Sequence, residues 1–333
     1  MSGSDPVLTV EGLSVAFTAG GSRTRPVEEV SFAVGRGDRF GIVGESGSGK
    51  SLTLLAIAGL VDHPGHVAAD TLRLEDADLL SISRSRRRAV LGTRMSMILQ
   101  DPLASLSPVW SVGEQIAETL RRHTRMPRSA AREETIELLA QVGIPDPRRR
   151  ADSFPHQLSG GMRQRVAIAI AMSCAPIVLL ADEPTTALDV SIQAQILDLL
   201  VEVCESRGMA LVMVTHDLAA LSRAAVGVGV MYAGRIVESG SLDRIRTAPA
   251  HPYTQALLLS APHLAPARAR SRLHTIPGAP PSPDKRPAGC PFHPRCPYVM
   301  DVCRTVRPPL VPIGDGVSAA CHLVPAVFAG GGS

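Results

Sequence analysis

The sequence predicts an α/β fold with a largely parallel sheet, and three observations support this. A short apolar segment, RFGIV at 39–43, leads into a glycine-rich turn and then into KSLTLLAIAGL at 50–60, whose apolar residues have helical spacing. Beyond residue 160, segments with strand and helix patterns alternate, as is typical of parallel strands covered by helices on both faces. Apolar residues make up 45% of the chain and aromatic residues only 3%, so we expect an aliphatic core.

The remaining elements follow from local patterns along the chain. The β-branched segments at 7–17 and 27–34 predict two strands before the glycine-rich turn. Residues 113–143 predict helices that are interrupted near Met126-Pro127, because proline disrupts a helix interior. The C-terminal half predicts a helix at 160–174, a strand at 177–181, a helix at 191–206, a strand at 210–215, a helix at 218–224 and a hairpin at 227–238.

Composition and charge exclude several classes of protein. The formal net charge of +3 is too mild for the basic footprint of a nucleic-acid-binding domain. No apolar segment approaches the roughly 18 residues that a membrane-spanning helix needs. The N-terminal residues MSGSDPVLTVEG lack the pattern of a secretory signal. We therefore expect a cytoplasmic chain that reaches a membrane only through partners.

The glycine-rich turn predicts a phosphate-binding loop. Residues 44–51, GESGSGKS, match the pattern G-x-x-x-x-G-K-S. The glycines allow backbone N–H groups to point at phosphate oxygens, and the helix that follows adds its positive N-terminal end. Lys50 is expected to reach the β- and γ-phosphates, and Ser51 to bind Mg²⁺. The expected nucleotide contacts come from the loop and the first helical turn: Gly44, Glu45, Ser46, Gly47, Ser48, Gly49, Lys50, Ser51 and Leu52.

A pair of carboxylates follows an apolar strand in IVLLADE, 177–183. Open α/β sheets bind their ligands at the carboxyl ends of strands, which is where this pair is expected. Asp182 would hold Mg²⁺, and Glu183 would polarise the attacking water in nucleotide hydrolysis.

The segment LSGGMRQR, 158–165, makes the class more specific, because it resembles the LSGGQ signature of ABC transporter nucleotide-binding subunits. Met162 replaces the glutamine, as it commonly does in the peptide-importer branch. The resemblance covers about residues 7–245. It implies that Ser159, Gly160 and Gly161 contact the γ-phosphate of ATP bound by a second, homologous or identical subunit, so that the pair clamps two ATP molecules head to tail.

Shorter motifs fit the same resemblance and add expected site residues. Gln100 in ILQDP corresponds to the glutamine that senses Mg²⁺ and the γ-phosphate. Asp189 in ALD corresponds to the loop that crosses the dimer interface, and His216 in VTHD to the switch histidine. Phe17 resembles the aromatic residue that stacks on adenine.

The resemblance also implies the domain organisation and the partners. It implies a P-loop ATPase core with a mostly parallel sheet, an antiparallel β subdomain, a helical subdomain at about 102–165 within residues 1–248, and a cysteine-rich extension at 249–333. Residues 101–116 would receive a cytoplasmic helix of a membrane subunit. Trp110 lies here, and the sequence does not decide between an exposed and a buried position. The implied complex joins this chain, at the cytoplasmic face of the membrane, to two transmembrane permease subunits and an extracellular substrate-binding protein.

Four cysteines follow a proline-rich segment, 262–291, that we expect to be an extended connector rather than a packed core. Cys290, Cys296, Cys303 and Cys321 have wider spacing than the C-x₂₋₄-C pairs of most structural zinc sites. This favours a 4Fe-4S cluster, with zinc or no metal as alternatives. The tail, together with HPYTQALL and IPGAPPSP, resembles the C-terminal extension of oligopeptide/dipeptide importers, and nickel importers are close relatives.

The sequence therefore predicts an ATPase that energises peptide import, with ATP and Mg²⁺ as its ligands. A nickel or other small-solute importer of the same branch is the first alternative. A soluble ABC ATPase acting on ribosomes or DNA, and a redox sensor whose output is the ATPase, are further alternatives. The transported peptide is not encoded in this chain, because selectivity lies in the partner subunits.

Overall fold

The computed structural model describes residues 5–19, 21–186, 188–260 and 275–324 of the 333-residue chain. Its contacts divide the chain into two compact units, each assembled from separate stretches of sequence. The first unit includes Val34–Asp38 and Leu74–Met213, and the second includes Thr9–Ala33, Arg39–Arg73 and the described residues from Val214 onward.

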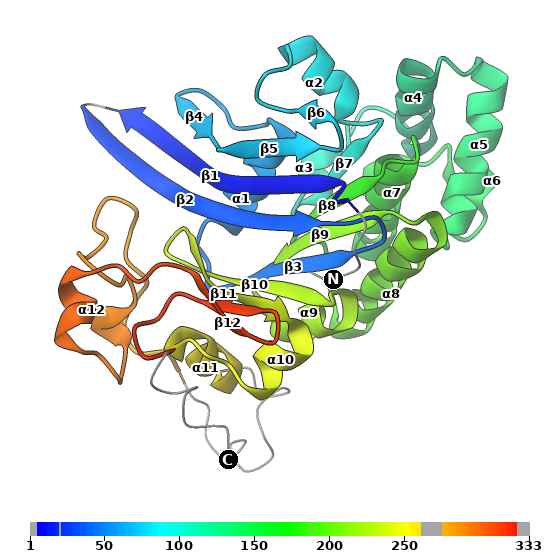
Figure 1. Ribbon diagram of the computed structural model, residues 1–333. Helices are drawn as coiled ribbons and strands as arrows, with labels where there is room; N and C mark the ends of the chain where they lie inside the picture. Colours follow the sequence, from blue (N-terminus) through cyan, green and yellow to red (C-terminus); the bar gives the residue numbers. More distant parts are fainter. Residues whose placement is uncertain (1–4, 20, 187, 261–274, 325–333) are drawn as a thin grey trace. The chain divides into compact units, whose positions relative to one another are not determined.

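The second unit begins with a sheet built on two long neighbouring strands, β1 (Leu8–Ala19) and β2 (Ser22–Val34) (Figure 1). β1 also pairs with β5 (Thr71–Leu74) and, antiparallel, with β4 (Gly65–Ala68), where Val15 lies opposite Val67. The two strands expected near the N-terminus are confirmed, and both are longer than the sequence pattern indicated.

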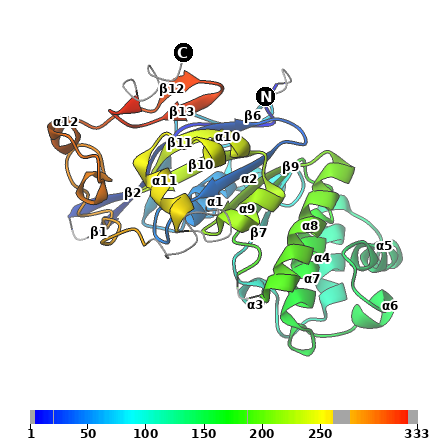
Figure 2. The ribbon, with the colours of Figure 1, turned by 90° about the horizontal axis from the view of Figure 1, so that it is seen from below.

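A further set of strands in the second unit carries the glycine-rich loop. β3 (Arg39–Val43) pairs in parallel with β10 (Gly227–Tyr232), which pairs antiparallel with β11 (Arg235–Ser241). The pairing continues from β11 to β13 (Val317–Ala319) and from β13 to β12 (Val311–Gly314) (Figure 2). The end of the cysteine-rich extension therefore extends the same run of strands as the glycine-rich loop.

Short helices complete the second unit, and a buried carboxylate on β11 holds the segment just before α11 (Pro252–Leu259). Glu238 is fully buried on β11, and its carboxylate accepts hydrogen bonds from Ala250 N (2.7 Å) and His251 N (2.9 Å) just before α11. His251 Nδ1 in turn accepts from Tyr253 N at 3.0 Å. The helices are α1 (Lys50–Ala58), α9 (Leu218–Ala224), α10 (Leu242–Thr247), α11 (Pro252–Leu259) and α12 (Asp301–Thr305), with a 3₁₀ turn at His293–Arg295.

Three strands of the first unit are short and mostly buried. β7 (Met95–Ile98) pairs in parallel with β8 (Val178–Asp182), and β8 neighbours β9 (Ala210–Thr215). Every residue of β8 is buried, which explains why its sequence is a continuous apolar run rather than an alternating one. A two-residue strand, β6 (Ala77–Asp78), also belongs to this unit.

The helices of the first unit include a packed group in which α4, α5 and α7 contact one another and α7 contacts α8 (Figure 2). The break expected near Met126-Pro127 is confirmed, because α4 ends at Thr124, Arg125 is left-handed, and α5 begins after Pro127. The helices of this unit are α2 (Arg84–Val90), α3 (Pro102–Ser105), α4 (Val112–Thr124), α5 (Arg128–Gln141), α6 (Pro147–Arg150), α7 (Gly160–Met172) and α8 (Val190–Arg207), with a 3₁₀ turn at Pro155–Gln157.

A search for membrane-spanning helices among the described residues finds none with the necessary length and apolar character. The predicted fold class is confirmed by the mixture of parallel and antiparallel strands and by the helices that accompany them.

Candidate functional site

The glycine-rich loop joins β3 to α1 within the second unit, and its glycines are required by its geometry. Gly47 and Gly49 have φ angles of 78° and 105°, in the left-handed region that favours glycine. A Cβ atom at Gly44 would lie 2.1 Å from the backbone oxygen of Met231 on the neighbouring strand β10. Substitution at Gly44 therefore requires the loop and β10 to move apart.

Lys50 lies against the backbone of this loop and is only 4% exposed. Its Nζ donates hydrogen bonds to Gly44 O (2.8 Å), Glu45 O (3.0 Å) and Ser48 Oγ (3.4 Å). Ser46 and Gly47 are exposed, while Ser51 and Leu52 are half-buried in the first turn of α1. A buried cation inside a curled glycine-rich loop at a helix N-terminus is an arrangement that favours anions such as phosphate.

The Asp-Glu pair lies at the carboxyl end of β8 in the first unit. Asp182 is the last residue of the strand and is 5% exposed. Glu183 follows with a φ angle of 44°, a left-handed conformation that is uncommon for a residue other than glycine and that often accompanies a functional site. Its Oε2 accepts hydrogen bonds from Gln100 Nε2 (3.1 Å) and Thr186 Oγ1 (2.9 Å). The structure therefore brings the predicted Gln100 and Glu183 into direct contact.

The signature segment begins helix α7 in the same unit. Ser159 is the exposed N-cap residue, and its Oγ accepts from Met162 N at 3.4 Å. A Cβ atom at Gly161 would lie 2.8 Å from Ile192 Cγ2, and one at Gly160 would lie 3.3 Å from Leu188 Cδ2. The two glycines therefore allow the start of α8 and the preceding loop to approach α7 closely.

The loop before α8 places Asp189 at the helix N-terminus, where it is exposed. Gln193 Nε2 braces this loop by donating to Thr185 O (3.2 Å) and Leu188 O (3.0 Å). Ala187, which belongs to the predicted ALD motif, lies outside the described residues.

His216 and Phe17 belong to the second unit. His216 is exposed in the turn between β9 and α9, and the next residue, Asp217, caps α9 by accepting from Ala219 N at 2.7 Å. Phe17 is half-buried on β1 opposite Gly65, a position that leaves part of its ring accessible. The roles of both residues stay predictions.

The four tail cysteines line one small cavity, together with His251 and Phe292. Burial raises the pKa of the Cys290 thiol to about 11 and raises the pKa values of the Cys296 and Cys321 thiols as well. Cys290 N donates to Cys303 O at 2.8 Å, which fixes two of the cysteine backbones relative to each other. Within the described residues, no group of three or more His, Cys, Asp or Glu side chains is arranged to hold a metal ion.

Sequence reasoning missed the contacts that Glu45 of the glycine-rich loop makes with the C-terminal extension. Its carboxylate forms a two-point ion pair with Arg295, and its backbone N–H donates to Tyr253 Oη at 2.8 Å. A local pattern offers no signal for a pair 250 residues apart.

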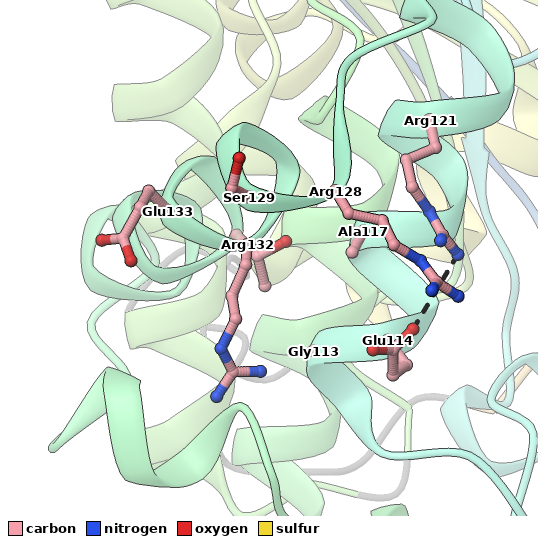
Figure 3. Close-up of a pocket in the computed structure, with 9 residues that line it drawn as sticks. Gly113, Glu114, Ala117, Arg121, Arg128, Ser129, Arg132 and Glu133 are labelled. Carbon is pink, nitrogen blue, oxygen red and sulfur yellow. Dashed lines mark ion pairs between the residues drawn. The ribbon is translucent and has the colours of Figure 1, made fainter.

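A larger cavity, of about 530 Å³, lies between α4 and α5 (Figure 3). Its charged lining residues form ion pairs, including Arg121 with Glu114 (3.9 Å) and Arg132 with Asp152 (3.0 Å). None of the nucleotide motifs described above lines this cavity.

Comparison with protein families finds two matches in the chain. Residues 27–186 match the ABC transporter family, and residues 237–303 match the oligopeptide/dipeptide transporter C-terminal region. The chain is 50% identical to the dipeptide transport ATP-binding protein DppD of Escherichia coli (strain K12), over 95% of this chain and 96% of that protein. The chain belongs to the ABC transporter family. It is therefore an ABC-type ATPase, as the nucleotide motifs predicted.

Other relatives and solved structures agree with this family membership. The ABC ATPase is 44% identical to the oligopeptide transport ATP-binding protein AppD of Bacillus subtilis (strain 168), over 95% of this chain and 96% of that protein. Among solved structures, it resembles a dimeric ATP-binding cassette in a post-hydrolysis state with ADP and Pi, with 26% identity and a TM-score of 0.62. That match covers 71% of this chain and 98% of the cassette.

Proposed function

We propose that this ABC ATPase energises the import of dipeptides or oligopeptides. The observation that carries the proposal is the presence, in one chain, of an ABC transporter match and an oligopeptide/dipeptide transporter C-terminal match. Relatives at 44–50% identity that bear dipeptide or oligopeptide transport names support it. A nickel or other small-solute importer of the same branch is the alternative.

The proposed hydrolytic roles are those that the motifs imply, residue by residue. Lys50 and the loop around it hold the ATP phosphates, while Ser51 and Asp182 bind Mg²⁺. Glu183 polarises the attacking water, and its hydrogen bond to Gln100 gives the glutamine a means to couple Mg²⁺ and γ-phosphate binding to the position of the carboxylate. His216 contacts the γ-phosphate, and Phe17 stacks on adenine.

The second subunit of the pair completes each ATP site. Ser159 and Asp189 are exposed at helix N-termini, where they are available to ATP held by another chain. The helix dipole and the free N–H groups at Gly160 and Gly161 favour a γ-phosphate at the start of α7. The dimeric form of the similar solved cassette supports the pairing of two subunits.

The segment after Gln100 is the proposed contact with the membrane subunits. Leu103, Val109 and Trp110 are 52%, 75% and 48% exposed, so these large apolar side chains are accessible to a partner. In the proposed complex this chain lies at the cytoplasmic face of the membrane and binds two transmembrane permeases, an extracellular substrate-binding protein completes the complex, and no nucleic acid takes part. In this proposal residues 1–248 are the ATPase domain, 102–165 its helical subdomain, and 249–333 the extension.

We also propose that Cys290, Cys296, Cys303 and Cys321 hold a 4Fe-4S cluster. The four side chains face one cavity with apolar neighbours, and burial raises the pKa of the thiols, so that thiolates there require compensating positive charge. The ligand atoms of one zinc ion must all lie about 2–2.3 Å from a single point, whereas each cysteine of a cluster binds a different iron. The wide spacing of the four cysteines along the sequence therefore supports the cluster, with zinc or no metal as the alternatives.

The transport proposal is tested by co-purification and uptake. The tagged chain is isolated from membranes, and uptake of a labelled dipeptide and of nickel is compared in cells with the wild-type chain and with the Lys50→Ala variant. We expect two polytopic subunits to co-purify and only dipeptide uptake to depend on Lys50. Lys50-dependent nickel uptake without peptide uptake would establish the alternative, and association with ribosomes or DNA would refute both.

The cluster proposal is tested by metal analysis of protein purified without oxygen. We expect about four irons and four acid-labile sulfides per chain. About one zinc per chain without iron would refute the cluster and leave the ATPase unaffected, and a metal-free chain would do the same.

A further inference from the structure

The second residue of the phosphate-binding loop is anchored by the C-terminal extension rather than by the ATPase core. Arg295 Nη1 and Nη2 donate to Glu45 Oε2 (2.7 Å) and Oε1 (2.9 Å). The Arg295 side chain is 5% exposed and the Glu45 side chain 25% exposed. A two-point guanidinium–carboxylate contact that is largely shielded from water fixes orientation as well as distance.

The other contacts of Arg295 also come from the extension or from β10, so the side chain has little freedom. Its Nε donates to Pro277 O at 2.8 Å, and Nη2 also lies near the carbonyls of Ile276 (3.3 Å) and Gly278 (3.4 Å). The guanidinium lies over the rings of Tyr232 and Phe292, with distances of 5.8 and 6.0 Å to their centroids. Lysine cannot reproduce this set of planar contacts.

Glu45 connects this anchor to the residue expected to bind phosphate. Its backbone oxygen accepts a hydrogen bond from Lys50 Nζ at 3.0 Å, and its backbone N–H donates to Tyr253 Oη at 2.8 Å. A shift of Glu45 therefore moves a hydrogen-bond partner of Lys50. On the other side, Arg295 directly precedes Cys296, and Phe292 beneath its guanidinium lines the cysteine cavity.

We propose that Arg295 is a positioning residue for the phosphate-binding loop, through which the cysteine-lined segment sets the affinity of the chain for ATP. The proposal rests on the proposed ATP-binding role of the loop, but it does not depend on which metal, if any, the cysteines hold. Loss of the Arg295–Glu45 contact leaves the loop present but less often in its binding conformation. The expected consequence is weaker ATP binding, because apparent affinity falls with the population of the competent state.

The test measures the dissociation constant of a fluorescent ATP analogue with Mg²⁺, on the full chain purified without oxygen. We expect Arg295→Gln and Glu45→Gln each to raise the constant about tenfold, which corresponds to about 1.4 kcal/mol. The double variant should bind no more weakly than either single variant, because both changes remove the same contact.

The matched control is Arg286→Gln. Arg286 also joins the extension to the N-terminal strands, through an ion pair with Glu28 at 3.0 Å. The two side chains are 11% and 13% exposed, so this pair is as shielded as the Arg295–Glu45 pair. Glu28 lies on β2 and not in the phosphate-binding loop. We expect this variant to bind the analogue like the wild type. A constant within twofold of wild type for a folded Arg295→Gln or Glu45→Gln variant overturns the positioning role, and so does an equal weakening by Arg286→Gln.

Lys50→Ala distinguishes this failure from failure of the proposed function. If wild type binds the analogue and Lys50→Ala does not, the loop is the ATP site, whatever Arg295 does. If Lys50→Ala binds like wild type, the loop is not the ATP site and the positioning proposal fails with it. If Arg295→Gln does not fold, Glu45→Gln provides the test, because the Glu45 side chain is partly exposed and its replacement disturbs the fold less.

Discussion

Glu238 should be a large single contributor to the stability of the extension. Its carboxylate is buried on β11 and accepts two backbone N–H groups, at 2.7 and 2.9 Å, just before α11. Glu238→Ala leaves both donors without this acceptor, at about 1–3 kcal/mol for each buried unsatisfied group. For the two donors together we therefore expect a loss of roughly 2–6 kcal/mol. Glu238→Gln keeps one acceptor oxygen and should lose about half as much.

Hydrogen–deuterium exchange of peptides spanning 249–259 measures this effect where it occurs, and urea unfolding followed by circular dichroism measures it globally. At about 1.4 kcal/mol per tenfold, the alanine variant should exchange at least about twentyfold faster in this segment. The control is Glu202→Ala, because Glu202 is an exposed glutamate on α8. This variant should change the free energy of unfolding by less than about 0.5 kcal/mol. Unchanged protection at 249–259 in Glu238→Ala would refute the reasoning.

The same carboxyl predicts a pH dependence with a definite sign. Burial raises the pKa of Glu238 above its ordinary value, so the folded chain binds this proton more tightly than the unfolded chain does. The contribution of the group to stability is therefore fully present below the unfolded pKa and is lost as pH rises through the raised pKa. The difference in unfolding free energy between wild type and Glu238→Gln, measured from pH 4 to 8, isolates this contribution. The wild type should lose stability relative to Glu238→Gln as pH rises, and a relative gain would contradict the predicted sign.

Two further variants test packing and the partner surface. Gly161→Val should lower the free energy of unfolding in urea by about 1–3 kcal/mol, because even its Cβ would lie 2.8 Å from Ile192 Cγ2. Adding Ile192→Ala should recover part of this loss, and no recovery would show that the strain lies elsewhere. Trp110→Ala should leave the ATPase rate of the isolated chain unchanged, because the side chain is 48% exposed, while reducing recovery of the membrane subunits in co-purification; equal recovery would remove Trp110 from the proposed contact.

The sequence predicted helices and strands correctly where the segment itself has a clear local pattern. The strands at 39–43 and 210–215 have the bounds that the sequence indicated, and the helix break falls at Pro127. β7 was missed because MSMI is only four residues long and carries no alternation. The hairpin of β12 and β13 was missed because its pairing with β11 is a long-range choice that short, weakly patterned strands do not encode.

The candidate site, like the fold, was predictable from local patterns and not from long-range contacts. Motifs of contiguous residues identified the phosphate loop, the Asp-Glu pair and the signature helix, whereas contacts between distant residues were not visible. The proline-rich segment was expected to be only a connector, yet carbonyl oxygens of Ile276, Pro277 and Gly278 hold Arg295 against the loop. The sequence left the position of Trp110 open, and in the structure its side chain is 48% exposed.

The most direct test of the central claim uses Glu183→Gln, which keeps the size of the side chain but removes the carboxylate. The purified variant is mixed with ATP and Mg²⁺, its mass is measured by light scattering, and the release of phosphate is followed in the same sample. An ATPase that works as a head-to-tail pair predicts ATP-dependent dimers with turnover near zero. Near-normal turnover would contradict the role of Glu183, and a tightly ATP-bound variant that stays monomeric would contradict the pair.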